Sequence, residues 1–447
     1  MYIIGINFGY KETTGSFYDT ESRRGVVGRL HILDGDTSEL CKVESAVCRN
    51  RKTGEWQFAK DVRDYSLPDF SNDFIGPMNA MAPKKKEAFA AFVRLVFAHI
   101  LKNQEFLQYN PVTGERNFEI YVALGKENIN QAKEYKNFIS SIIPLDWVIP
   151  DSMAVYFKFK AEKTECKDNS PVSSALVINI DSRSIDFTAY NENGKQSLLK
   201  VYEHGSSAIE NLIYKYFEEH DENFNIAKEE GEALCSSINI DWRNAVIHYI
   251  NREKELFYNY ELSGLCLTLS TGLCLDLSNR LICNGKRRVF DDYCISNEQL
   301  NDEILAPYRQ TLLQDMNDVK QRLAKGKNGI PEVVILTGES SRMPWLQRLV
   351  KDVFSDSQVF LDNDPSYVVS DGLAYYGTGI HKMKSAIENL KTSIATVFHE
   401  FHIQDYNTAY ADYVISKMQD FLEDEHMLEY AKKEPEKQEE PIRLKKS

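Results

Sequence analysis

The stretch Val333-Val-Ile-Leu-Thr-Gly-Glu-Ser-Ser-Arg-Met-Pro344 joins an apolar run to a turn rich in glycine and serine, and then to a proline. The run of aliphatic residues predicts a buried strand. Pro344 suits the first turn of a following helix, where its missing N–H leaves no hydrogen bond unmade. The stretch therefore predicts a strand, a tight turn and a helix whose N-terminus faces a cleft, an arrangement that suits phosphate groups.

Two hairpins, far apart in the chain, share one pattern. The first occupies residues 2–18 and the second residues 175–190. In each, a run rich in β-branched residues is followed by a short polar turn and a second extended run. Asn7 and Asn179 hold the same place in the two hairpins. A pattern that recurs in this way predicts an internal repeat.

The segments after each hairpin also follow a common order, in which helical and extended apolar stretches alternate. In the first half we expect helices over 84–107 and 130–142 and strands over 118–124 and 146–149. In the second half we expect helices over 208–217, 242–258, 301–323 and 345–354 and strands over 262–269, 274–277 and 332–336. Two similar α/β halves, residues 1–170 and 171–380, are the simplest description.

The composition changes beyond these halves, because strand formers give way to a helical repeat. Apolar residues recur there at spacings of three and four: Ile387, Leu390, Ile394, Val397 and Phe401. With a second amphipathic stretch over 406–430, this pattern predicts a helical extension over 381–430. The apolar stripe packs either against the chain's own domain or against a partner helix. Residues 431–447 have little to bury, and we expect them to be disordered.

The charge and composition exclude several classes of function. The 447-residue chain carries a formal net charge of −14, which opposes docking on a long polyanion, so we expect no nucleic-acid partner. No apolar run in the sequence reaches the length of a membrane span, so we expect no membrane partner. The N-terminus lacks the basic start and small-residue cleavage site of a signal peptide, so we expect a cytoplasmic location.

The order of these pieces resembles a known family. Two strand–turn–strand units, then Thr-Gly-x-Ser-Ser-Arg-Met-Pro, then Asp-Pro followed by Gly-Leu-Ala-Tyr-Tyr-Gly377, are similar to the nucleotide-binding domain of the seventy-kilodalton heat-shock protein (DnaK-like) family, within the actin-like ATPase superfamily. The resemblance covers residues 1–380, and Leu336–Pro344 carries most of its specificity. It implies an α/β, duplicated actin-like ATPase fold of two lobes, each a mixed five-stranded sheet with helices.

The resemblance implies phosphate loops at Asn7–Thr14 and Asn179–Asp186 and an adenosine loop at Gly338–Arg342. Asp151 and Asp186 are the implied catalytic acids, although Asp151 lies one position later than the family's glutamate. No residue is assigned to a metal. The implied nucleotide-binding residues are Asn7, Gly9, Tyr10, Lys11, Lys60, Asn179, Asp181, Ser182, Arg183, Gly205, Lys254, Gly338, Glu339, Ser341 and Arg342.

The chain departs from the family at the positions that carry its chemistry. Where each phosphate loop of the family has an aspartate that orders the water shell of magnesium, this chain has Asn7 and Asn179. An amide carries no charge and cannot act as a general base near neutral pH. Glu339 replaces a glycine of the adenosine loop. We therefore expect weak or absent magnesium binding and slow or absent ATP hydrolysis.

Two alternatives for the added cations, Lys11 and Arg183, lead to two functions. If they neutralise a polyphosphate, the cofactor is ATP or ADP, and the protein is a chaperone-like switch that signals to a protein partner through a lobe surface or its C-terminal helices. If Arg183 pairs with Asp181 or Asp186, the cleft is filled and the chain is a nucleotide-free pseudo-ATPase scaffold. A small-molecule kinase is disfavoured, because it also needs an acidic base. The residues after Gly377 are too few for the family's substrate-binding domain, so we expect none.

Overall fold

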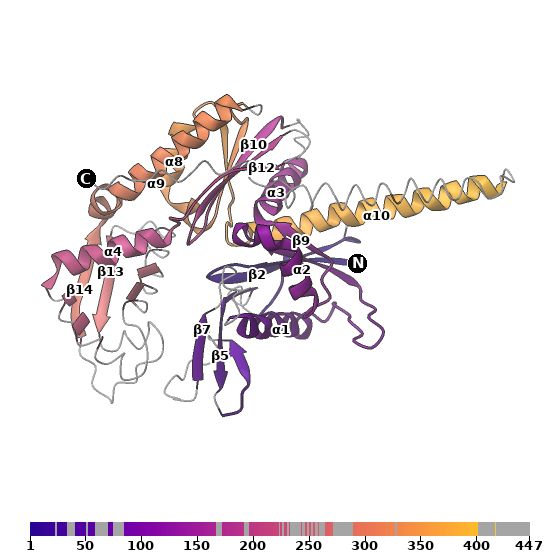
Figure 1. Ribbon diagram of the computed structural model, residues 1–447, viewed down its shortest axis with the longest axis horizontal. Helices are drawn as coiled ribbons and strands as arrows, with labels where there is room; N and C mark the ends of the chain where they lie inside the picture. Colours follow the sequence, from indigo (N-terminus) through magenta and orange to yellow (C-terminus); the bar gives the residue numbers. More distant parts are fainter. Residues whose placement is uncertain are drawn as a thin grey trace.

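The computed structural model describes residues 1–22, 25–33, 41–50, 52–58, 70–74, 85–166, 172–191, 196–222, 264–270, 289–326 and 329–400, and positions 224, 225, 228, 229, 232, 243, 246, 247, 250, 251, 254, 258 and 416. The fold is mixed α/β, with helices packed on sheets that contain both parallel and antiparallel strands (Figure 1). None of the helices in these ranges is apolar over enough residues to cross a membrane.

The N-terminal half of the chain, up to residue 166, contains a sheet built on the first predicted hairpin. Its strand order is β3-β2-β1-β8-β9, with β1 antiparallel to β2 and parallel to β8. The sheet has six strands rather than five, because β4 pairs with β2 beyond the end of the two-residue β3. The strands are β1 (Tyr2–Phe8), β2 (Glu12–Asp19), β3 (Gly28–Arg29), β4 (Lys42–Glu44), β8 (Phe118–Leu124) and β9 (Trp147–Pro150).

The C-terminal half, residues 172–361, contains a second sheet with the order β12-β11-β10-β15-β16. Its central strand is antiparallel to one neighbour and parallel to the other, as in the first sheet. Both predicted hairpins are therefore confirmed, and the two sheets share one order of strand directions. The strands are β10 (Ser174–Ile180), β11 (Ile185–Asn191), β12 (Gln196–Tyr202), β15 (Val333–Thr337) and β16 (Gln358–Leu361).

Helices cover both sheets, and smaller sheets flank them. Apolar side chains of α1 pack on β1 and β8 in one core, and those of α4, α8 and α9 pack on the second sheet in another. The helices are α1 (Lys86–Asn103), η3 (Lys126–Gln131), α2 (Ala132–Ser140), α3 (Asp151–Glu165), α4 (Ser207–His220), η4 (Gln299–Ile304), α8 (Ala306–Lys325), η5 (Glu339–Arg342), α9 (Pro344–Val353) and α10 (Val368–Glu400). The other strands are β5 (Ala46–Asn50), β6 (Trp56–Phe58), β7 (Phe70–Phe74), β13 (Gly264–Ser270) and β14 (Val289–Ser296).

Two of the predicted helices are irregular at their N-terminal ends. The helix expected over 301–323 begins as the π-helix η4, and the α-helix starts only at α8. Pro307 explains this break, because it has no N–H to bond a preceding carbonyl and is tolerated only in the first turn of α8. The helix expected over 130–142 is preceded by a 3₁₀ turn, η3, and becomes α-helical at Ala132. The strand expected over 274–277 lies outside the described residues.

The helix α10 crosses α3 at very close range. Gly372 makes this possible, because a Cβ atom at its position would lie 1.9 Å from the carbonyl oxygen of Ala154 in α3. Gly5 of β1 faces the same helix, and its Cβ would lie 2.2 Å from the carbonyl oxygen of Ser370. The helices α3 and α10 therefore pack backbone to backbone between the two sheets. In this position the helix pair fixes how the two sheets lie relative to each other.

A buried network of charges anchors the first turn of α10. Asp371, which is 4% exposed, accepts a hydrogen bond of 2.6 Å from the Ser16 hydroxyl and also contacts the Arg29 guanidinium. Lys158 of α3 lies 3.2 Å from Asp371 and 2.6 Å from Asp362. Burial alone would lower the pKa of Lys158, but Asp371 and Asp362 raise it above its ordinary value. At this crossing, Arg29 and Lys158 of the N-terminal half thus pair with carboxylates of the C-terminal half.

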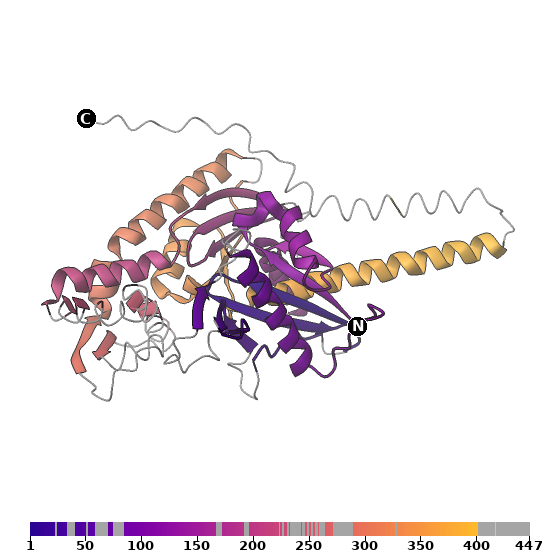
Figure 2. The same cartoon turned by 60° about the horizontal axis from the view of Figure 1, so that its bottom comes forward.

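Past the crossing, α10 continues well beyond the sheets as a single helix (Figures 1 and 2). The predicted extension from residue 381 is therefore a continuation of α10, at least as far as Glu400. Glu119 of β8 holds the helix near its exit, with His381 at 3.6 Å and Lys384 at 3.4 Å. Ile387 is 7% exposed and Leu390 is 47% exposed. The rest of the predicted stripe, and the tail over 431–447, lie outside the described residues and side chains.

Candidate functional site

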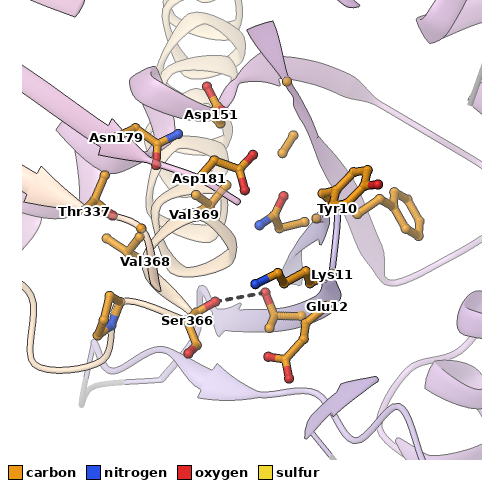
Figure 3. Close-up of a pocket in the computed structure, with 18 residues that line it drawn as sticks. Tyr10, Lys11, Glu12, Asp151, Asn179, Asp181, Thr337, Ser366, Val368 and Val369 are labelled. Atoms are coloured by element: carbon orange, nitrogen blue, oxygen red, sulfur yellow. Dashed lines mark hydrogen bonds between the residues drawn. The ribbon is translucent and has the colours of Figure 1, made fainter. Parts of the chain in front are cut away.

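Three turns meet at the carboxyl ends of β1, β10 and β15 and enclose a cavity of about 100 Å³. Tyr10 and Lys11 face Asn179 and Asp181 across it, so each half of the chain supplies one wall (Figure 3). The predicted site residues that line it are Asn7, Gly9, Tyr10, Lys11, Asp151, Asn179, Asp181 and Gly338. The predicted residues Ser182, Arg183, Gly205, Ser341 and Arg342 lie in or next to the same turns, and Lys254 contacts Glu210 of α4. None of these six is among the described lining residues.

The first loop is shaped by its own backbone and by Ser45. A Cβ atom on Gly9 would lie 2.4 Å from the carbonyl oxygen of Glu12, so the turn itself requires glycine. The buried Ser45 donates its hydroxyl to the carbonyl oxygen of Gly9 at 2.7 Å and its N–H to that of Lys11 at 2.7 Å. The loop is therefore held in one conformation by protein contacts.

Lys11 reaches across to the other half of the chain. Its Nζ lies 2.7 Å from Asn251 Oδ1 and 3.3 Å from Oε1 of Glu210 in α4. Glu210 is 1% exposed, and the same oxygen accepts a hydrogen bond of 2.7 Å from Lys254. Burial alone would raise the pKa of Glu210, but Lys254 and Lys11 hold it below its ordinary value. We call Lys11, Glu210 and Lys254 the cleft triad.

Arg183 makes a second contact between the halves. Its guanidinium carbon lies 4.3 Å from the centre of the Tyr10 ring, and one of its N–H groups donates to the Tyr10 hydroxyl. This is a cation–π contact combined with a hydrogen bond. The predicted pairing of Arg183 with Asp181 or Asp186 stays a prediction, and the contacts above join Arg183 to Tyr10 of the first loop.

The second loop is braced by the turn before α4. The carbonyl oxygens of Asp181 and Ser182 accept the N–H groups of Ser206 and Ser207 at 2.9 and 2.8 Å. A Cβ atom on Gly205 would lie 2.1 Å from the Asp181 carbonyl oxygen, so glycine is needed there for this approach. Asp181 Oδ1 accepts the N–H of Ser182 at 2.5 Å, which turns this carboxylate back on its own loop.

The two predicted catalytic acids lie in different environments. Asp186 is 1% exposed, and its Oδ2 accepts a hydrogen bond of 3.1 Å from the side-chain amide of Asn179. Asp151 is the first residue of α3 and lines the cavity, where its Oδ1 accepts the N–H of Ser152 at 2.7 Å. Of the two acids, Asp151 is the one that faces the cavity.

The predicted adenosine loop follows β15 as the short helix η5. Gly338 has a φ of 92°, and a Cβ there would lie 2.2 Å from the carbonyl oxygen of Ile180, so glycine is required on both grounds. Ser341 is buried, and Arg342 contacts Asp364 at 3.4 Å. The Glu339 side chain and the whole of Lys60 lie outside what the structure describes.

Sequence reasoning missed the acid that joins the halves, Glu210. Its position could have revealed it, because it lies on the apolar face of α4 with Ile213, Tyr214 and Phe217 at spacings of three, four and seven. A carboxylate on such a face is buried only when it is paired. Asn251 carries no comparable signal.

Oxygen atoms line both walls of the cavity, and Lys11 already contacts the carboxylate of Glu210. Among the described residues, no three His, Cys, Asp or Glu side chains gather as they would around a metal ion.

Neither a scan against protein-family models nor a search of curated proteins finds a match to this chain.

Proposed function

We propose that this chain is a degenerate DnaK-like protein with the duplicated actin-like ATPase fold, and that it acts as a pseudo-ATPase scaffold through protein–protein contacts. The common strand order of the two sheets, the crossing of α3 and α10 between them, and the cleft at the ends of β1, β10 and β15 support this fold. In the proposal, residues 1–170 form lobe I and residues 171–380 form lobe II.

The proposed scaffold function rests on one observation. Lys11 and Arg183, the cations of the two loops, each contact another group of the protein. Lys11 contacts Glu210, and Arg183 contacts Tyr10. Each contact joins lobe I to lobe II at the point where the family places phosphate. A polyphosphate would have to displace both contacts and expose the buried carboxylate of Glu210, at a cost in desolvation and repulsion.

The cavity itself supports the same conclusion. Its volume of about 100 Å³ is below the roughly 300 Å³ at which small-molecule sites begin. Among the described residues, three carboxylates line it, from Glu12, Asp151 and Asp181, together with the ammonium group of Lys11. An excess of negative charge opposes an incoming polyphosphate unless a cation accompanies it. Magnesium binding remains predicted to be weak or absent.

A second candidate, a nucleotide-dependent switch, is favoured by one observation. The hydroxyls of Ser206, Thr337 and Ser340 are buried and have no hydrogen-bond partner within the described part of the chain. Thr337 lines the cavity, Ser340 lies in η5 and Ser206 in the turn before α4. Buried polar groups in proteins are nearly always paired. A nucleotide entering between the lobes would supply partners while it opened the cleft triad, which is a hinge-type change.

An assay of ATP hydrolysis tests the proposed loss of catalysis. We expect phosphate release from ATP and magnesium to equal that of a protein-free control. The double variant Asn7→Asp/Asn179→Asp should also stay at that level, because Lys11 and Arg183 remain engaged. Phosphate release that rises in proportion to wild-type protein, and that is abolished in Asp151→Asn, would contradict the proposal.

A further inference from the structure

A larger cavity, of about 840 Å³, lies in the C-terminal half, away from the cleft. One wall is a face of α4 that carries Ala208, Leu212 and Lys215, and another is the start of α8 with Pro307 and Tyr308. The volume falls within the roughly 300–1,000 Å³ of sites that take a ligand or a short segment of a partner. None of the residues assigned to the cleft lines this cavity.

The charge of this cavity differs from that of the chain as a whole. The described residues of its lining include three cations, Lys215, Lys228 and Arg243, and two carboxylates, Glu218 and Glu232. The chain as a whole has a formal net charge of −14. A cavity with an excess of positive charge on an acidic protein favours a negatively charged partner by electrostatic complementarity.

The three cations are not equally available. Lys228 donates to Glu218 at 2.6 Å, and this hydrogen bond raises the pKa of Lys228 above its ordinary value. Lys215 lies 3.3 Å from Glu219 one turn further along α4. The exposed Arg243 pairs with neither carboxylate of the lining in the described part of the chain. Arg243 is therefore the cation best placed to meet a partner's anionic group.

Arg243 is also held in position. One of its N–H groups donates to Asn211 Oδ1 at 3.1 Å, and its guanidinium carbon lies 5.3 Å from the centre of the Tyr214 ring. A guanidinium carries five N–H donors in a fixed plane, so these contacts leave donors for a carboxylate. Since the side chain is already ordered by Asn211 and Tyr214, less conformational entropy is lost on binding.

We propose that the cavity between α4 and α8 docks a segment of a partner protein that places a carboxylate on Arg243 and a bulky apolar side chain against Leu212 and Tyr308. The partner's apolar side chain would displace water from Leu212 and Tyr308, which form the apolar part of the site. Arg243 supplies the polar contact. The two carboxylates of the lining oppose a multiply charged phosphate group, which favours a single carboxylate. This inference goes beyond the scaffold proposal and does not depend on the state of the cleft.

Fluorescence anisotropy of the full chain tests the inference with two labelled peptides, Ser-Trp-Gln-Leu-Glu-Trp-Ser, which has one glutamate, and the same peptide with glutamine in place of that glutamate. We expect the glutamate peptide to bind about tenfold more tightly, as a charge-assisted hydrogen bond predicts. Arg243→Glu should weaken binding of the glutamate peptide by at least about tenfold, and Arg243→Gln by less.

Arg348→Glu is the matched control, because Arg348 is an exposed arginine of α9 outside this cavity. It makes the same change of net charge and should leave the affinity unchanged. Melting curves of all variants verify that they fold. Equal affinity for the two peptides, equal loss in Arg243→Glu and Arg348→Glu, or no binding of the glutamate peptide at millimolar concentration would each overturn the inference.

Discussion

Replacing Gly372 with alanine is expected to lower the free energy of unfolding by about 3 kcal/mol. The new Cβ would lie 1.9 Å from the carbonyl oxygen and 2.4 Å from the carbonyl carbon of Ala154. Those atoms belong to the backbone of α3, so no side-chain rotation can relieve the contact. The helices α3 and α10 would have to separate, and the packing of both sheets on them would loosen.

Gly379→Ala is the matched control for this substitution. Gly379 lies in the same helix, and a Cβ at its position would meet no atom within 4 Å. Alanine there should stabilise the protein by about 0.5–1 kcal/mol, because glycine is a poor helix former. Chemical unfolding followed by circular dichroism measures both effects. Equal shifts of the midpoint in the same direction would show that the crossing is not as close as described.

Replacing Glu210 with alanine is expected to cost about 3–5 kcal/mol of stability. The change would leave the ammonium group of Lys254, whose side chain is 4% exposed, without its carboxylate. An uncompensated buried charge is the costly outcome, rather than the loss of the ion pair itself. The double variant Glu210→Ala/Lys254→Met should therefore recover much of the lost stability. A double variant as unstable as the sum of its two single changes would contradict this account of the cleft triad.

The buried carboxylate of Glu210 should also make the stability of the protein depend on pH. Lys254 and Lys11 hold the pKa of Glu210 in the folded protein below its ordinary value, near 4.3 in an unfolded chain. Its contribution is therefore fully present above that unfolded value and is lost as the pH falls through the lower, folded pKa. Glu210→Gln should show a smaller loss of stability than wild type between pH 5 and about pH 2. Parallel stability curves for the two proteins would exclude Glu210 as a source of acid sensitivity.

Much of the fold could be predicted from the sequence because its signals are local. The two hairpins and β15 are runs of aliphatic residues, and Pro344 begins α9 as its position indicated. The start of α8 was predicted less well, because apolar spacing predicts one helix over 301–323 and does not register the break at Pro307. Whether a segment forms a strand or a helix depends largely on residues close to it in sequence, so the spacing of its apolar residues predicts it.

The contacts that close the cleft were beyond such reasoning. Lys11 and Glu210 are 199 positions apart, and Arg183 and Tyr10 are 173 positions apart. Their partners depend on how the two halves come together, which no local pattern encodes. Gly205 illustrates the same limit, because its role in approaching the Asp181 carbonyl is visible only once both turns are placed.

The most direct test of the central claim is a calorimetric titration of the full chain with ATP, run with and without magnesium. The account predicts no saturable heat in either case, because Lys11 and Arg183 are engaged across a cavity of about 100 Å³. A saturable heat that is lost in Arg342→Ala would contradict it, and would establish the nucleotide-dependent switch instead.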